Sequence, residues 1–341
     1  MVWTVNLQTR TGGALVTGAP LNSFTASWSL DGPGRFEADI GEDDAASWLA
    51  GQRRIVVLSG GVAKWTGWLN GLVESTQTYD DIAKPSGTTL TASGLGLASV
   101  LGHRIVHGDF NKFLTNATTI AWNLIQHAQA QSDGDYSFTL GTITGTAPNR
   151  TRHYCDGDVI ADAINELAAL SPGGFDWEIT ELGVFKAWVG TRGSASGETL
   201  TRAEAMTWDV SNDTSELVTY ATALGSVEEP CGAPLVIRSS GLVSTYGRLE
   251  SVVEMDSNDS VELDELGDEE LRARAGIRLR LRASWPETKA PWAWGAVWLG
   301  DTLSVTFPTH FGGVKTMRVI EVSISVEPPT FGYVEYEFEV I

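Results

Sequence analysis

Short segments in which apolar and polar residues alternate, separated by glycine-rich turns, constrain the fold of this chain most strongly. The stretch FTASWSLDGPGRFEADI alternates on both sides of its DGPG turn. The pattern recurs in RRIVVLSGGVAKWTGWLNGLVES, which predicts strands at 55–58, 63–69 and 72–77. A period of two places successive side chains on opposite faces of a strand, and glycine turns join antiparallel neighbours. Residues 1–105 are therefore predicted to form a small antiparallel barrel or sandwich.

Two segments with helical periodicity follow in residues 106–195. In NATTIAWNLIQHAQAQ, apolar residues recur three and four positions apart, and Thr115 or Asn116 is placed to cap the helix. DGDVIADAINELAAL repeats the spacing, with Asp156 or Asp158 as the expected cap. Strands are predicted from YSFTLG, FDWEIT and GVFKAWVG, so these residues are expected to form a separate α+β unit.

Strands return in residues 196–341, after the glycine- and serine-rich stretch GTRGSASGETL. One helix is predicted over 263–283, because acidic residues open it and arginines close it, as the helix dipole favours. Its last part, IRLRLRA, also alternates as a strand would. The expected strands of this third unit are 216–224, 235–238, 302–307, 317–326 and 333–341.

Charge and composition exclude several classes of protein. The chain has 23 basic and 43 acidic residues, and residues 196–341 hold 11 of the basic and 24 of the acidic ones. This negative charge disfavours direct binding to nucleic-acid phosphates or to anionic membranes. No long apolar run and no secretory core are present, so we expect a soluble protein that is not exported by a signal peptide. Cys155 and Cys231 match no zinc spacing and are expected to be reduced thiols.

The final segment, YVEYEFEVI, predicts a strand with one apolar face and three glutamates on the other, Glu335, Glu337 and Glu339. Like charges on one face repel each other by a few tenths of a kcal/mol per pair. No lysine or arginine follows Arg318, so this strand has no basic residue of its own. The acidic face is expected either to contact outer solvent or to serve a function that needs negative charge.

No active site is recognisable in the sequence. His103, His107 and Asp109 are better explained as solvated or core residues than as metal ligands. The acidic stretch DSNDSVELDELGDEE has valine where a calcium loop needs its glycine. Nucleophile-elbow, Walker and dinucleotide-binding motifs are absent. We therefore predict no catalytic, cofactor-binding or metal residues, although a carboxylate pair formed only in space would not be visible in a sequence.

Four stretches, in their order along the chain, are the landmarks of its layout. The first is SLDGPGRFEADI followed by LAGQRRIVVLSGGVAKWTGWLNGLVES, and the second is TASGLGLASVLGHRIV. The third is ATTIAWNLIQHAQAQSDGD followed by DVIADAINELAALSPGGFDWEIT and GVFKAW. The fourth is YGRLESVVE with the charged helix and VWLGDTLSVTF. In this order they resemble the baseplate hub or tail-tip hub proteins of long-tailed bacteriophages, in particular the minor tail hub proteins of siphophages that infect actinobacteria. The resemblance covers nearly the whole chain and rests on this layout, because the family has no catalytic signature.

The resemblance implies a mainly β fold with two tail-tube-like antiparallel β-barrels, residues 1–105 and 196–341, and an inserted α+β domain, residues 106–195. It implies a non-enzymatic structural hub without cofactors, in which three copies form a ring that joins the tail tube to the distal tip. The expected partners are further copies of the chain, tube proteins, tip or spike proteins and the tape measure protein, with the host envelope as a further contact. The expected location is the virion tail tip, after assembly in the host cytoplasm. DNA would pass through the ring without specific binding, and Glu335, Glu337 and Glu339 would line its lumen as a wall that repels phosphate.

Two other functions stay open at this point. A carbohydrate-binding tail protein would use some of the 13 tryptophans on an exposed face, whereas here they alternate with apolar residues as core residues do. A tail-associated cell-wall hydrolase would need a carboxylate pair or a metal site, which the five scattered histidines do not supply. Many hub proteins continue into adhesive or lytic extensions, whereas this sequence stops just after its last predicted strand, so no lysin or adhesin role is expected.

Overall fold

The structure is a computed structural model of the chain of 341 residues. It describes residues 3–21, 23–30, 32–40, 53–77, 87–170, 173–213, 217–225, 235–255, 259–274, 278–292, 295–327 and 331–341.

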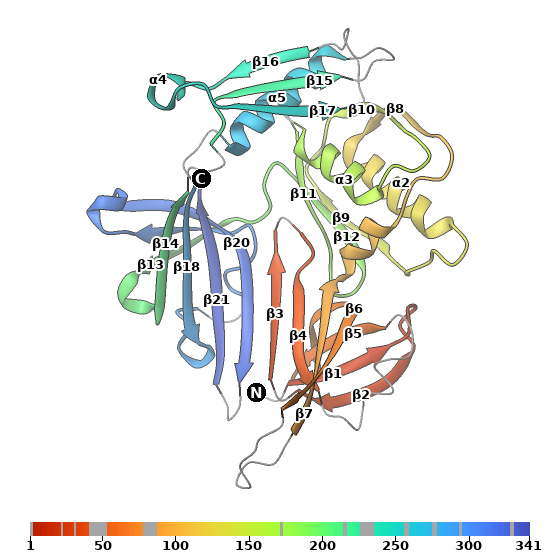
Figure 1. The fold of residues 1–341 in the computed structure, drawn as a ribbon, viewed down its shortest axis with the longest axis vertical. Helices are drawn as coiled ribbons and strands as arrows, with labels where there is room; N and C mark the ends of the chain where they lie inside the picture. Colours follow the sequence, from red (N-terminus) through yellow and green to blue (C-terminus); the bar gives the residue numbers. More distant parts are fainter. Residues whose placement is uncertain are drawn as a thin grey trace.

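One large sheet runs through both ends of the sequence and forms the lower part of the molecule in Figure 1. Its strands, in order across the sheet, are β14 (Thr207–Asp213), β18 (Arg278–Pro286), β21 (Phe331–Val340), β20 (Val314–Glu327), β3 (Ser23–Ser29), β4 (Arg35–Ile40), β7 (Gly87–Gly96), β6 (Val62–Gln77), β5 (Arg54–Ser59), β1 (Trp3–Gln8) and β2 (Ala14–Pro20). Strands β13 (Ala195–Thr201) and β19 (Thr302–Thr306) branch from β20.

The N-terminal and C-terminal parts of the chain meet where β20 pairs with β3. This antiparallel seam runs from the pair Glu321–Ser29 to the pair Val326–Phe24. Side chains from both parts then share one hydrophobic core, with Trp65 and Phe36 from one part and Trp285, Tyr336 and Phe338 from the other. The mainly β fold is confirmed. The strand pairings among the described residues close no barrel, so the two barrels stay a prediction.

The helices lie with three small sheets in an upper lobe above the large sheet (Figure 1). Its first segment contains η2 (Leu97–His103), β8 (Phe110–Asn116), α2 (Ala117–Ala130), β9 (Thr139–Thr144), β10 (Asn149–Tyr154), α3 (Ile160–Ala169), β11 (Phe175–Ile179) and β12 (Val184–Val189). Its second segment contains β15 (Tyr220–Gly225), β16 (Leu235–Ser239), α4 (Val243–Tyr246), β17 (Glu250–Met255) and α5 (Ser260–Arg274). The small sheets are β10-β8, β11-β12-β9 and β16-β15-β17.

The two segments of the upper lobe share a second hydrophobic core. Ile120 of α2 and Ile164 of α3 are fully buried in it, together with Leu263 of α5 and Ala223 of β15. Residues of the predicted third unit, 196–341, thus pack against residues of the predicted middle unit, 106–195. The predicted boundaries at 105 and 195 stay predictions.

Helix α2 confirms one predicted cap, whereas α3 contradicts the other. Asn116 caps α2, because its side-chain oxygen accepts a hydrogen bond from the backbone N–H of Thr118. The N-cap of α3 is Val159, which supplies no side-chain bond. Asp158 instead accepts from the N–H of Cys155, and Asp156 accepts from the N–H of Gly108. Both aspartates therefore stabilise the loop before α3, and the prediction that either caps the helix was wrong.

The charged helix predicted over 263–283 was too long. Helix α5 ends at Arg274, and Arg278–Pro286 is strand β18 in the large sheet. As one helix, the segment would place Arg274, Arg278 and Arg282 four residues apart, where like charges repel. As a strand, it places Arg280 and Arg282 on one face and buries Leu279 and Leu281 on the other.

The remaining predictions concern strand β6, three tryptophans and the two cysteines. The strands predicted at 63–69 and 72–77 are one strand, β6, with an irregularity in pairing between Leu69 and Gly71. Trp65 and Trp68 are core residues, as predicted, and Trp48 lies outside the described residues. Cys155 is exposed and Cys231 lies outside the described residues, so the state of the two thiols stays a prediction.

Candidate functional site: the polar face of the large sheet

Strand β21 has the two faces that its sequence predicts. Val334, Tyr336 and Phe338 are buried in the core of the large sheet. Glu335, Glu337 and Glu339 are half-buried on the opposite face. The alternation is therefore confirmed, and the three glutamates do share one face of the sheet.

Arginines from the two neighbouring strands lie on the same face as the glutamates. On β18, Arg280 is opposite Glu339 and Arg282 is opposite Glu337. On the other side, Arg318 of β20 is also opposite Glu339. The glutamates are thus flanked by positive charge on both sides.

Direct ion pairs join β18 to β21 on this face. Arg282 donates a hydrogen bond to Glu337 with a nitrogen–oxygen distance of 2.7 Å, and Arg280 lies 3.4 Å from the same carboxylate. Arg282 also lies 3.5 Å from Glu335. This compensation was not predicted from the sequence, because the arginines were assigned to a helix. The alternation in IRLRLRA is the signal that indicates it.

The pKa values of two groups reflect this arrangement. The hydrogen bond to Glu337 raises the pKa of Arg282 above its ordinary value. Burial raises the pKa of the Glu335 carboxyl, and the nearby charge of Arg282 lowers it only in part. The negative charge of Glu321 raises it further. Arg282 therefore compensates the negative charge of Glu335 only in part.

Arg318 links the polar face to the upper lobe. Its guanidinium group donates to the carboxylate of Asp176 on β11 and lies 3.5 Å from the backbone carbonyl of Arg192. Arg192 in turn pairs with Glu178 at 2.7 Å. Four charged side chains therefore connect β20 of the large sheet to β11 of the upper lobe.

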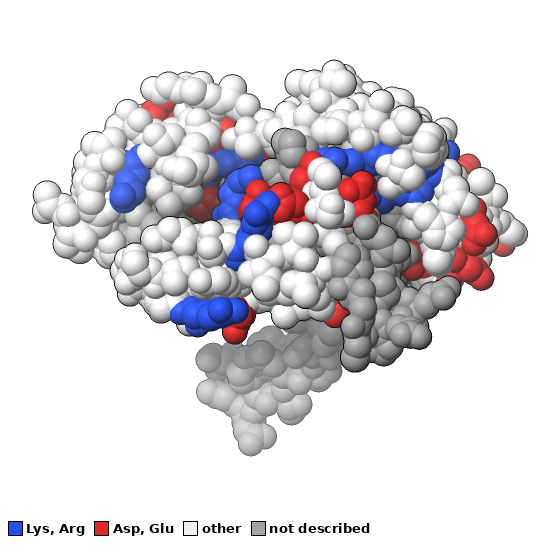
Figure 2. All heavy atoms as spheres, turned by 90° about the horizontal axis from the view of Figure 1, so that it is seen from above, with Lys and Arg blue, Asp and Glu red and all other residues white. Residues whose placement is uncertain are grey.

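The polar face continues across the seam between the two parts of the chain. Ser325 of β20 and Thr25 of β3 lie opposite each other, with their hydroxyl oxygens 3.0 Å apart. On β4, Asp39 accepts hydrogen bonds from Ser23 at 2.6 Å and from Thr91 at 3.1 Å. The register of β20 with β3 and of β3 with β4 therefore extends the polar face over strands from both ends of the sequence. Figure 2, which views the molecule from above, shows acidic and basic side chains next to one another in a band across its middle.

The histidines considered in the sequence do not form a metal centre. The backbone N–H of His107 donates to the ring of His127 at 3.0 Å. In the part of the chain that the structure describes, no three His, Cys, Asp or Glu side chains come together in a way that could hold a metal ion. Within the same residues, no helix combines the length and the apolar character needed to cross a membrane.

Solved structures with the same fold include tail proteins. The 43 kDa tail protein of prophage MuSo2 from Shewanella oneidensis superposes with a TM-score of 0.69 at 13% identity, covering 99% of this chain and 98% of that one. The tail protein from Neisseria meningitidis MC58 superposes with a TM-score of 0.67 at 14% identity, covering 99% and 97%.

This chain has the fold of a phage tail protein. The resemblance inferred from the sequence is thereby confirmed at the level of the fold. A more distant match is the E. coli c3393 protein, a component of the type VI secretion system with structural similarity to the T4 tail proteins gp27 and gp5. It superposes with a TM-score of 0.50 at 12% identity, covering 94% of this chain and 74% of that one. No family model and no curated protein sequence matches the chain.

Proposed function

We propose that this chain is the structural hub of a phage tail tip, located in the virion and without enzymatic activity. The observation that carries the proposal is the full-length match in fold to phage tail proteins, with both chains covered almost completely. The match to a protein described as similar to gp27 and gp5 favours a hub over other tail components.

The proposed assembly is a ring of three copies. The large sheet joins an N-terminal and a C-terminal set of strands through the β20–β3 seam. If each set forms one tube-like barrel, three chains supply the six units that match a sixfold tail tube, and a closed threefold ring satisfies every interface. Tube and tape measure proteins would contact one end of the ring, and tip or spike proteins the other. The host envelope is a further contact of the tip.

The polar face of the large sheet is the surface that we assign to the channel. Its hydroxyl groups and closely paired charges offer DNA no extended patch of free positive charge. Phosphate would therefore pass without being retained, because retention needs unneutralised lysine or arginine. On this proposal Glu335, Glu337 and Glu339 face the lumen and keep Arg280 and Arg282 neutralised.

Ejection of DNA through the ring tests this assignment. Replacing all three glutamates by lysine would set five positive side chains of each chain against one another, three on β21 and Arg280 and Arg282 on β18, and would weaken the fold. The better variant is Ser323→Lys with Ser325→Lys, because both serines lie on the polar face of β20 and the first is opposite Glu335. We expect normal assembly and slower ejection, with a delay that shrinks as salt concentration rises.

The matched control is Ser323→Glu with Ser325→Glu, which adds side chains of similar length and opposite charge. Ejection from this variant is expected to match that of the parent phage. Equal ejection rates for the lysine and glutamate variants, in fully assembled virions, would show that the polar face is turned away from DNA.

Binding of wall carbohydrate and hydrolysis of the wall are the alternative functions. The large tryptophans Trp65 and Trp285 are buried in the core, which leaves them unable to contact a glycan. Zymography on host cell walls, with and without divalent metal, is expected to show no clearing. Clearing that disappears when a carboxylate of this chain is replaced would overturn the structural proposal.

A further inference from the structure

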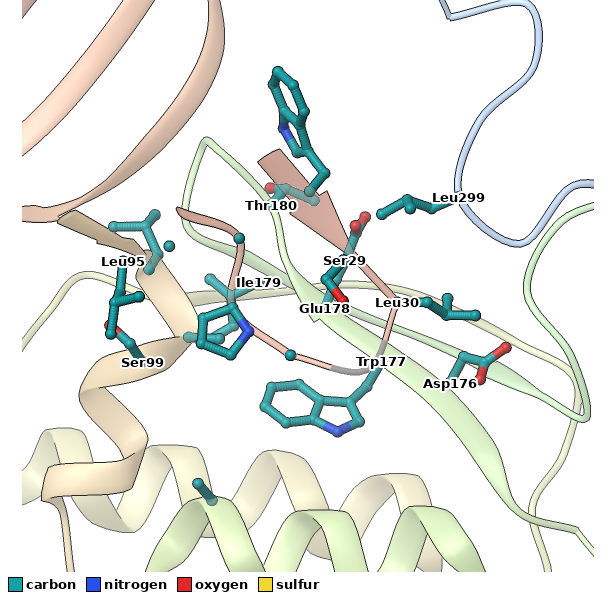
Figure 3. A pocket seen from close by; sticks show the side chains of 18 of the residues that line it. Ser29, Leu30, Leu95, Ser99, Asp176, Trp177, Glu178, Ile179, Thr180 and Leu299 are labelled. Carbon is teal, nitrogen blue, oxygen red and sulfur yellow. The ribbon is translucent and has the colours of Figure 1, made fainter. Parts of the chain in front are cut away.

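A cleft of about 590 Å³ lies between the upper lobe and the large sheet. Asp176 and Glu178 of β11 lie on its wall (Figure 3). Both carboxylates are paired within the chain, because Asp176 accepts a hydrogen bond from Arg318 and Glu178 lies 2.7 Å from Arg192. These two residues therefore offer a partner no free charge. The small sheet β16-β15-β17 differs, because one of its faces carries exposed apolar side chains.

Helix α5 covers one face of this small sheet, which lies at the top of the molecule in Figure 1. Ala221 of β15 is buried in a cluster with Leu271 of α5. Arg238 of β16 pairs with Asp264 and Asp268 of the same helix. Because successive side chains of a strand point to opposite faces, the residues on either side of Ala221 and Arg238 lie on the face away from α5.

The face away from α5 is apolar at its centre. Thr222 of β15 lies opposite Ile237 of β16 on one side and Val252 of β17 on the other. Leu224 and Leu235 form the next cross-strand pair on this face. Leu235, Ile237 and Val252 are 54%, 50% and 59% exposed. Neighbouring aliphatic side chains that are exposed to this extent are typical of an interaction surface.

The two ends of this face carry different charges. At one end, the guanidinium group of Arg248 lies 4.3 Å from the centre of the Tyr220 ring and donates to Glu250 at 2.8 Å from Nε and 2.7 Å from Nη2. Its Nη1 group has no partner among the described residues. At the other end, Glu254 of β17 is exposed and forms no ion pair with the residues that the structure describes. One end thus offers N–H donors and the other an unpaired carboxylate.

We propose that a second copy of this chain covers this face, across a twofold axis that runs across the strands along the row of Ile237, Thr222 and Val252. In this arrangement β17 of one copy lies over β17 of the other with its direction reversed. Ile237 and Val252 then pack on the same residues of the second copy. Arg248 of each copy meets Glu254 of the other, so both unpaired groups gain a partner. Two sheets that pack face to face with nearly aligned strands are the common arrangement of β-sandwiches.

The charges favour this orientation over the other twofold arrangement. An axis parallel to the strands would place Glu254 over Leu235 of the second copy and would leave Arg248 without a countercharge. A twofold axis is not a symmetry element of a threefold ring. The contact therefore belongs to the free chain before it enters a ring, and it does not depend on the hub assignment.

The mass of the free chain in solution tests this inference. Sedimentation equilibrium at increasing protein concentration is expected to show a change from the mass of one chain to twice that mass. A monomer at every concentration, or a trimer, would overturn the proposal. The copy number in virions tests the ring separately, so the two proposals can fail independently.

Two exposed valines supply a matched test of the surface. Val252→Asp places a carboxylate at the centre of the contact and is expected to raise the dissociation constant of the dimer by about tenfold or more. Val261 is 61% exposed but lies on α5, on the other side of the sheet. Val261→Asp is therefore expected to dimerise as the parent does. Equal dissociation constants for the two folded variants would contradict the proposal.

Two charge variants test the orientation of the copies. Arg248→Glu sets carboxylates against each other at both contacts, and Glu254→Arg sets guanidinium groups against each other, so each variant alone is expected to dimerise about tenfold more weakly than the parent. In a one-to-one mixture the two variants carry opposite charges at both contacts. Heterodimers are therefore expected to form more tightly than either homodimer. A mixture that associates no better than the separate variants would overturn the proposal.

Discussion

Arg282 on β18 and Glu337 on β21 are joined by a hydrogen bond of 2.7 Å on the polar face of the large sheet. The side chain of Arg282 is 54% exposed and that of Glu337 only 12% exposed. The glutamate is therefore the more desolvated partner and depends more on the contact. In the sequence of β21 the charge of Glu337 has no basic residue beside it, and in the fold Arg282 of the neighbouring strand compensates it.

Removing Arg282 is expected to destabilise the fold. In Arg282→Ala, Glu337 keeps only the longer contact to Arg280, and we expect a loss of about 1 kcal/mol in the free energy of unfolding, typical of a partly exposed charged hydrogen bond. Urea denaturation measures the loss. The exchanged pair, Arg282→Glu with Glu337→Arg, should recover part of it. An exchanged pair that is less stable than both single variants would show that the contact contributes nothing.

The free energy of unfolding is expected to depend on pH through the carboxyl group of Glu335. Burial raises the pKa of its carboxyl in the folded state, so the folded chain binds more protons than the unfolded chain. Stability from this group is present at low pH and is lost as pH rises from the ordinary glutamate pKa to the raised one. Glu335→Gln should remove this pH-dependent loss, so the free energy of unfolding of the variant should rise relative to that of the parent across this pH window. The rise is expected to be only a few tenths of a kcal/mol, because the side chain of Glu335 is 39% exposed and solvent screens its charge.

Denaturant titrations at several pH values measure this gain. Glu198→Gln, at an exposed glutamate of β13, is the control for the substitution itself. A gain for Glu335→Gln that is constant with pH, or that shrinks as pH rises, would contradict the assignment.

The upper lobe contains a buried ion pair between Arg152 of β10 and Glu262 of α5, at 2.5 Å. Both residues are nearly inaccessible to solvent. Arg152→Ala leaves the carboxylate of Glu262 in a buried site without this partner, and we expect a loss of about 3–5 kcal/mol. Replacing both residues by methionine should restore most of the stability. Calorimetry or urea denaturation measures both changes, and an equal loss in the single and double variants would refute this explanation.

Gly67 of β6 and Gly102 of η2 give a matched test of how closely the large sheet is packed around Gly67. A Cβ on Gly67 would lie 2.2 Å from the carbonyl oxygen of Leu95 and 2.3 Å from the Trp65 ring. Gly67→Ala is therefore expected to cost about 1–3 kcal/mol through overpacking. A Cβ on Gly102 would meet nothing within 4 Å. Gly102→Ala should stay within about 0.5 kcal/mol of the parent, and a similar loss in both variants would show that the close approach at Gly67 is not the cause.

Local patterns in the sequence predicted correctly those helices and strands whose structure does not depend on contacts with distant segments. The alternation of Val334, Tyr336 and Phe338 predicted β21 and its faces, and Asn116 marked the start of α2, because burial periodicity and capping act within a few residues. Residues 278–283 were predicted to be helical because the acidic-to-basic gradient of α5 continues through them. Their strand state depends on pairing with β14 and β21, which lie far away in the sequence.

The candidate site was predictable only in part, for the same reason. The three glutamates were identified, but Arg318 and Asp176 are 142 positions apart and meet only through the tertiary fold. The packing of α5 against the middle unit is likewise a contact between distant segments. No period in the sequence indicates either relationship.

The proposed assembly is a ring of three copies whose polar sheet face surrounds a channel. An electron cryo-microscopy reconstruction of the tail tip in purified virions measures both the copy number and the orientation of this face. We expect three copies on a threefold axis, with the polar face of β18, β21, β20, β3 and β4 turned towards that axis. Six copies at one level, or three copies with this face turned to the outside, would contradict it.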